Sequence, residues 1–328
     1  MFHSWRHSSS NYKTVYFLLA CWRPFMSLER RQWHRIEGAG GKTNDILHGL
    51  CQSGIKHSDT NVLYFPGDVQ ETEEYMKKGP NHEWIQWSYE TTVDRLCERF
   101  PRSNTFLVRP RRMVKETFNC FDHFVNGNLL GAPDHANSFG ALHHITEIVG
   151  RLESDLGLSR DWMIVGFSHG CVVLNQISYE IAALEEIDSK PSGNEDFKKS
   201  CKDPDDDVNI LDGVSTLAAD WLKSHDVTSI RDFISRIKVL YWLDGGHSGQ
   251  GNTWITDDAT IRALTVIPDI RVHVTPYQMK DKTRPWLERE ERQFVDKLKG
   301  YGGNVTEQMH FKDEEKSLSI HFNLLQEF

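Results

Sequence analysis

The residues with the clearest chemical potential are Gly166-Phe-Ser-His-Gly170, which follow the apolar run Trp162 to Val165 and precede a helix-prone stretch that begins at Val172. A serine on a sharp turn between a strand and a helix presents its hydroxyl above the edge of a sheet. That turn requires a positive φ at the serine and brings strand and helix together, so only small residues fit beside it. We therefore predict Ser168 as a nucleophile, with Gly166 and Gly170 as the small residues of the turn.

The five-residue pattern alone is weak evidence, because Gly-x-Ser-x-Gly arises by chance in about one chain in ten of this length. Its position between a β-branched strand and an amphipathic helix makes it stronger. A nucleophilic serine also needs a base, an acid that orients the base, and donors for the oxyanion, and each can be sought in the sequence.

The candidate base is one of the histidines that follow a late strand, because only these can fold back over Ser168. Four meet this condition: His247, His273, His310 and His321. His273 and His310 fall within predicted strands, where a histidine usually has a structural role. His321 follows the last predicted strand, at the start of the last helix, which agrees with the chain order serine, acid, histidine. We predict His321 as the base, the alternative being a histidine that only packs the terminal helix.

The candidate acid is Asp244, which ends a predicted strand and precedes two glycines. The carboxyl edge of a parallel sheet is where such sites assemble. Asp281 is the alternative, because it lies one strand later, several residues after Pro276. We favour Asp244, since a residue at a strand end is held more rigidly than one in a loop. An ordinary Asp-Gly turn is the structural explanation that competes with this role.

The predicted oxyanion hole has one donor from each of two segments. The backbone N–H of His169, the residue after the nucleophile, supplies the first. The second comes from the Pro66-Gly67-Asp68 turn after the strand at 61–65, through the N–H of Gly67 or of Asp68. An ordinary Pro-Gly turn is again the competing explanation.

Strands alternate with helices along the chain. This order predicts an α/β fold of the α/β-hydrolase-like kind: a mostly parallel, doubly wound sheet with helices on both faces. Expected strands are 61–65, 105–108, 162–165, 239–243, 270–275 and 305–311, and expected helices are 83–98, 140–156, 170–187, 214–236, 286–299 and 317–328. We predict a targeting or flexible segment at 1–55 and one domain at 56–328, with a charged surface insertion at 188–207.

Composition narrows the function classes. The 328 residues carry 47 acidic and 38 basic side chains, and no basic stripe points to nucleic acid. Six scattered cysteines without a Cys-x-x-Cys pair predict neither a zinc site nor a disulfide framework. The group His143, His144 and Glu147 lacks the spacing of a metal motif, so we predict no metal. No segment reaches transmembrane length.

The amino terminus has no acidic residue before Glu29 but contains basic residues and several serines. This composition favours an organelle transit peptide. The apolar run Val15 to Cys21 keeps a secretory signal as a less favoured alternative, and an unstructured terminus is the third.

Several stretches resemble a mitochondrial family with an α/β-hydrolase-like fold, the chromosome-2 open-reading-frame-69 type. They are residues 61–70, 166–176, 243–247, 252–254, 274–278 and 321–322, so the resemblance spans about residues 60–328. It implies a mitochondrial protein, in the matrix, linked to respiratory-chain maintenance and acting as a serine hydrolase. It supports the transit peptide and the roles given to Ser168, Asp244 and His321.

Two functions follow from these patterns. The favoured one is a serine hydrolase that cleaves an ester, thioester or related acyl bond of a small-molecule substrate through an acyl-Ser168 intermediate, with no cofactor and no metal. The alternative is a non-catalytic protein of the same fold that acts as a binding or assembly factor.

Overall fold

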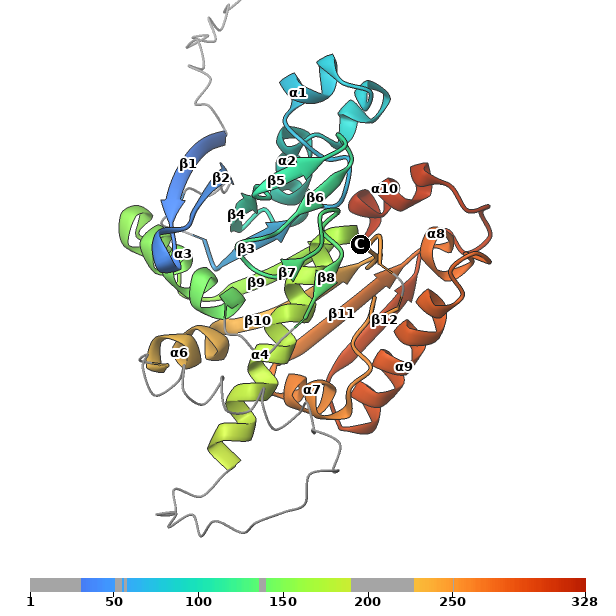
Figure 1. Cartoon of the computed structure of the whole chain (residues 1–328). Helices are drawn as coiled ribbons and strands as arrows, with labels where there is room; N and C mark the ends of the chain where they lie inside the picture. The colour runs from blue at the N-terminus through green and yellow to red at the C-terminus, as the bar shows by residue number, and fades with distance from the viewer. Residues whose placement is uncertain (1–30, 51–54, 56–57, 136–139, 190–226, 250) are drawn as a thin grey trace, which may run out of the picture. The chain divides into compact units, whose positions relative to one another are not determined.

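A computed structural model describes residues 31–50, 55, 58–135, 140–189, 227–249 and 251–328. Its centre is an eight-stranded sheet in the order β1-β2-β4-β3-β9-β10-β11-β12 (Figure 1). The strands are β1 Arg31–Glu37, β2 Thr43–Gly49, β3 Thr60–Phe65, β4 Ser103–Val108, β9 Trp162–Phe167, β10 Ile237–Leu243, β11 Asp269–Val274 and β12 Val305–Met309.

Strand β2 is antiparallel to both of its neighbours, and every other neighbouring pair from β4 to β12 is parallel. The central strand β9 is buried at all six positions, as expected for a parallel strand covered on both faces. The predicted fold class, a mostly parallel doubly wound sheet, is confirmed.

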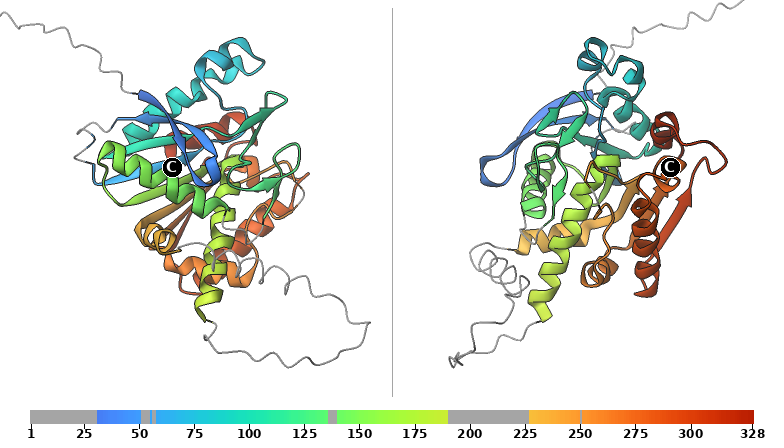
Figure 2. Two further views of the ribbon diagram at one scale, coloured as in Figure 1. Left: turned by 60° about the vertical axis from the view of Figure 1, so that its left-hand side comes forward. Right: turned by 45° about the vertical axis from the view of Figure 1, so that its right-hand side comes forward.

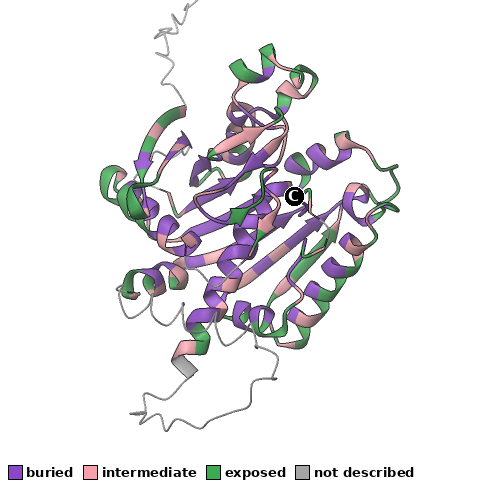
Figure 3. Ribbon diagram, in the orientation of Figure 1, coloured by how far each residue is buried: buried purple, intermediate pink, exposed green. Residues whose placement is uncertain are grey.

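Helices cover both faces of the sheet (Figure 1, Figure 2). One apolar core joins alternate strand residues to α3 Gly140–Leu156, α4 Cys171–Ser189, α6 Thr228–Arg236, α7 Asp258–Ala263 and α9 Trp286–Gly300. The other core joins the opposite strand residues to α2 Tyr89–Arg99 and α10 Leu318–Glu327. Figure 3 shows the inner strands of the sheet and most of α4 as buried, whereas the edge strands β1 and β12 are mostly intermediate or exposed and α9 alternates between buried and exposed residues. The two cores lie on opposite faces of the sheet because successive side chains of a strand point to opposite sides.

The sheet begins earlier than the sequence indicates. Residues 31–49 form the hairpin β1–β2, which pairs with β4, so the predicted domain start at residue 56 is corrected to residue 31. The hairpin is hard to recognise because in β1 only Ile36 is buried, which gives no alternating apolar pattern. The predicted targeting segment before residue 31 lies outside the described residues.

Two further segments differ from expectation. The single helix predicted at 83–98 is a 3-10 helix, His82–Trp87, followed by α2, because Ser88 caps α2 by accepting a hydrogen bond from the Thr91 N–H. Helix α4 extends to Ser189, and the rest of the predicted insertion at 188–207 lies outside the described residues, as does 214–226 of the predicted helix.

The segment between β4 and α3 forms two small hairpins. They are β5 Arg112–Val114 with β6 Phe118–Cys120, and β7 Asn126–Gly127 with β8 Pro133–Asp134. Two short helices, α1 Glu73–Lys78 and α8 Pro276–Met279, follow β3 and β11. None of the described helices is both long and apolar enough to cross a bilayer.

Candidate active site

Ser168 occupies a strained turn between β9 and α4. Its φ is 51°, in the left-handed region that non-glycine residues rarely adopt. A Cβ added at Gly170 would lie 2.0 Å from the Phe65 carbonyl oxygen, and one at Gly166 would lie 2.9 Å from the Cys171 Cα. The backbone geometry thus requires the two glycines for the reason inferred from the motif, and it turns the serine out of the regular strand.

Asp244 and His321 form a direct contact, with 2.6 Å between Asp244 Oδ2 and His321 Nδ1. The carboxylate is fully buried and also accepts hydrogen bonds from Thr275, at 2.8 Å from the backbone N–H and 2.6 Å from the hydroxyl. Since an ionised carboxylate only accepts, His321 Nδ1 carries the proton in this contact. In a neutral imidazole with this proton, the lone pair lies on Nε2.

Two aromatic rings hold His321 in place by stacking. Its ring lies between Phe167, at 4.6 Å between ring centroids, and Tyr277, at 4.5 Å. Phe167 precedes Ser168 directly, so the imidazole lies against the residue next to the turn. Ser317 caps α10 by accepting a hydrogen bond from the Ile320 N–H, which fixes the first helical turn and with it His321.

Asp281 is held in a different cluster. Its carboxylate accepts hydrogen bonds from Thr283 and forms ion pairs with Arg284 and Lys316, each at 2.7 Å. Burial alone would raise the pKa of this carboxyl, but the hydrogen bonds from Lys316, Thr283 and Arg284 outweigh it and lower the pKa strongly. The structure places Asp244, not Asp281, against His321.

The other candidate histidines are also engaged elsewhere. His273 Nδ1 lies 2.8 Å from His310 Nε2, so these two bind each other. His247 Nδ1 accepts a hydrogen bond from the Gly249 N–H, and burial lowers the pKa of His247 to about 4. His247 is therefore a neutral side chain within a loop.

The loop after β3 approaches the serine closely. A Cβ added at Gly67 would lie 2.8 Å from the Ser168 Cβ. The Gly67 N–H donates to Gln70 Oε1 at 2.9 Å, so this donor is already used. No described residue accepts a hydrogen bond from the Asp68 N–H. Of the two donors that the sequence left open in this loop, Asp68 has the available N–H.

Three contributors to this site are not predicted as site residues, although they lie in segments 61–70 and 274–278 of the resemblance: Thr275, Tyr277 and Gln70. Thr275 follows the end of β11, the strand next to β10, so the shared sheet edge explains its contact with Asp244. This neighbourhood depends on strand order, which the sequence does not give.

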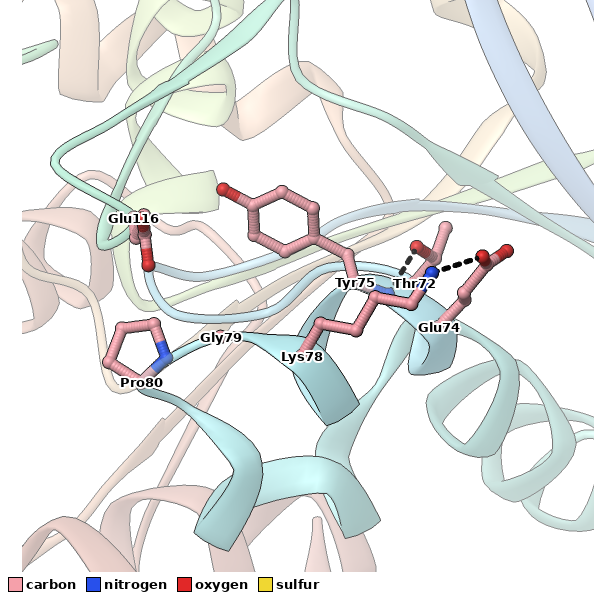
Figure 4. Close-up of a pocket in the computed structure, with 7 residues that line it drawn as sticks. All are labelled: Thr72, Glu74, Tyr75, Lys78, Gly79, Pro80 and Glu116. Atoms are coloured by element: carbon pink, nitrogen blue, oxygen red, sulfur yellow. Dashed lines mark hydrogen bonds and ion pairs between the residues drawn. The ribbon is translucent and has the colours of Figure 1, made fainter.

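A separate pocket of about 500 Å³ lies beside α1 and contains none of these residues (Figure 4). Its lining residues include Tyr75 and Glu116, and its charged pair Glu74 and Lys78 is already joined at 2.7 Å. We assign no chemistry to it.

The chain has an α/β-hydrolase fold. Three features define it: the strand order, the sharp turn after the central strand β9, and the Asp244–His321 contact at the carboxyl edge of the sheet. Solved structures resemble the chain only distantly. The match to a thermostable esterase has a TM-score of 0.41 and 12% sequence identity. It covers 90% of this chain and 60% of the esterase chain, so this chain spans less than two thirds of that esterase.

The chain belongs to the C2orf69 family, whose model matches residues 32–161 and 218–304. It is similar to the mitochondrial protein C2orf69 homolog of Danio rerio, with 32% identity over 84% of this chain and 74% of the relative. The homolog of Mus musculus is 33% identical over 88% of this chain and 83% of its own length. The mitochondrial location predicted from composition is confirmed by these relatives.

Proposed function

We propose that the protein is a serine hydrolase that cleaves an ester, thioester or related acyl bond of a small-molecule substrate. The observation that carries the proposal is the Asp244–His321 contact stacked against the residue that precedes Ser168. A buried carboxylate that fixes the protonated Nδ1 of a histidine leaves Nε2 as a base, which is the arrangement that activates a serine.

In the proposed reaction, His321 Nε2 takes the proton of Ser168 Oγ while this oxygen forms a bond to the acyl carbon. The bond to the leaving group then breaks, and the departing oxygen or sulfur receives the proton from Nε2. Water enters, gives a proton to Nε2 and attacks the acyl carbon. The acyl–Ser168 bond breaks, the acid is released and Oγ regains its proton.

The oxyanion of each tetrahedral intermediate would be bound by the backbone N–H groups of His169 and Asp68. The support for Asp68 is that its N–H is uncommitted, whereas that of Gly67 is bound to Gln70. Removing one such donor typically lowers kcat about 10²- to 10³-fold.

Labelling with a fluorophosphonate probe tests the proposal. We expect a phosphonate bond at Ser168 with release of fluoride, located by mass spectrometry of the peptide. Ser168→Ala should abolish labelling and His321→Ala should reduce it strongly. Ser235→Ala and His82→Ala, at exposed positions, are the matched controls. Folded wild-type protein that does not react would contradict the hydrolase and favour a binding or assembly role.

We also propose that the protein acts in the mitochondrial matrix in support of respiratory-chain maintenance. The mitochondrial relatives and the acid-free amino terminus support this placement. In cells that lack the protein, wild type should restore oxygen consumption and Ser168→Ala should not. Equal rescue by both would separate the respiratory role from the hydrolase chemistry.

A further inference from the structure

The two residues whose N–H groups are proposed to bind the oxyanion are also joined through their side chains. His169 Nδ1 lies 2.8 Å from Asp68 Oδ1. The two residues are 101 positions apart in the chain, one in the turn after β9 and the other in the loop after β3. Their contact is therefore a tertiary link between the two halves of the proposed oxyanion hole.

Both ring nitrogens of His169 face acceptors. Nε2 lies 2.9 Å from the Gly131 carbonyl oxygen, which can only accept, and Nδ1 faces the Asp68 carboxylate. The ring is fully buried, so water cannot complete either contact. Two hydrogen bonds therefore require a proton on each nitrogen, and the ring is an imidazolium paired with the carboxylate.

The charge state agrees with this geometry. Burial by itself would lower the pKa of His169, but the charge of Asp68 and the hydrogen bonds to Asp68 and Gly131 outweigh it and raise the pKa. Only the His169 side of the pair is fully buried, since the Asp68 side chain is 23% exposed. Removing Asp68 would leave the buried charge of His169 without its partner, which is costly.

The remaining contacts hold the loop but do not reach His169. The Asn119 N–H donates to Asp68 Oδ1 at 2.8 Å, and Asn119 Nδ2 donates to the Gly67 carbonyl at 2.6 Å. The next residue, Val69, has a φ of 72°, which is unfavourable for a β-branched side chain. The loop therefore has a strained backbone, and among the described residues the His169–Asp68 contact is the side-chain hydrogen bond that joins it to the turn at Ser168.

We propose that the His169–Asp68 side-chain pair is a positioning clamp that sets the separation between the backbone N–H groups of the same two residues in the oxyanion hole. This inference rests on the proposed serine hydrolase. Asp68 and His169 would then contribute twice: the backbone binds the developing charge, and the side chains keep the two backbones at the required spacing.

The clamp is tested by a double-mutant cycle with Asp68→Asn, His169→Gln and the combined variant. The readouts are the rate of fluorophosphonate labelling at Ser168, and kcat and KM for p-nitrophenyl butyrate. We expect each single variant to lower kcat and the labelling rate at least about 10-fold, with KM changed less than about 2-fold. The double variant should be no slower than the slower single variant, because the two side chains act as one unit.

Asp122→Asn is the matched control. Asp122 lies between β6 and β7 and forms an ion pair with Arg112, and no hydrogen bond or ion pair of the described residues joins it to Asp68 or His169, so its loss should leave the labelling rate unchanged. Urea unfolding of every variant separates loss of fold from loss of rate. If a single variant does not fold, Asp68→Glu provides a second test, because a longer carboxylate keeps the ion pair but changes the spacing; its kcat should fall.

The outcomes separate the clamp from the function on which it rests. Multiplicative losses in the double variant, or folded single variants that label as fast as wild type, would overturn the clamp and leave the hydrolase standing. Folded wild-type protein that neither labels nor hydrolyses the ester would overturn both.

Discussion

The substitution Asp244→Asn tests the proposed catalytic machinery at its most buried contact. Asp244 Oδ1 accepts the Thr275 N–H, and Oδ2 accepts both the Thr275 hydroxyl and His321 Nδ1–H. An amide that keeps its oxygen on the Thr275 N–H must place its NH₂ group at the Oδ2 position. The Thr275 hydroxyl can turn and accept a hydrogen bond from this NH₂ group. His321 Nδ1 can accept one only if it gives up its own proton.

The size of the effect follows from this change of tautomer. With its proton moved to Nε2, His321 can no longer accept the proton of Ser168. The loss of a correctly protonated base in such a triad lowers kcat about 10⁴-fold, or about 5 kcal/mol of transition-state stabilisation. We expect a loss of this order for Asp244→Asn, with the fold retained because the amide replaces the carboxylate in shape.

The assay is fluorophosphonate labelling together with hydrolysis of p-nitrophenyl butyrate, with urea unfolding to verify the fold. Asp281→Asn is the decisive comparison, because it removes the other candidate carboxylate, and Asp232→Asn is the exposed control. Asp281→Asn should weaken stability by breaking its ion pairs and leave kcat near wild type once the protein is folded. A folded Asp244→Asn with wild-type kcat, or a selective loss in Asp281→Asn, would refute the assignment.

Three further predictions concern the support of the site and the pH dependence of stability. Thr275→Val should lower kcat about 10-fold without unfolding the protein, because it removes one of the hydrogen bonds that orient Asp244; an unchanged kcat would contradict this. Gly170→Ala should lower the urea-unfolding free energy by about 3 kcal/mol through its backbone clash, whereas the unobstructed helical Gly150→Ala should not. Glu291 is fully buried, no described residue hydrogen-bonds to its carboxylate, and burial raises its pKa to about 8. In the unfolded chain this carboxyl ionises at a lower pH than in the folded protein, so the free energy of unfolding should fall as pH rises from about 4.5 to about 8. In urea titrations at several pH values, Glu291→Gln should flatten this slope, whereas Glu288→Gln should not. An unchanged slope in Glu291→Gln would count against the buried acid.

The elements that a sequence can reveal are those whose burial pattern is local. β9 is apolar at consecutive positions and α3 has a clear apolar face, and both lie at the predicted residues. The hairpin β1–β2 escapes prediction because an edge strand buries little, and its partner β4 lies far along the chain. The same limit explains the missed break at Ser88, where one capping hydroxyl outweighs the apolar periodicity that continues across it.

The sequence by itself determined the strained turn, because the requirement for glycines around Ser168 is a matter of local backbone geometry. It also determined the order of the candidate residues along the chain and the alternation that forms a two-layered core. Which carboxylate meets His321, which N–H in the loop after β3 is free, and the pairing of His169 with Asp68 were decided only by tertiary structure. These contacts join residues that are distant in the chain, and their distances depend on strand order and on how the helices pack, which no local pattern encodes.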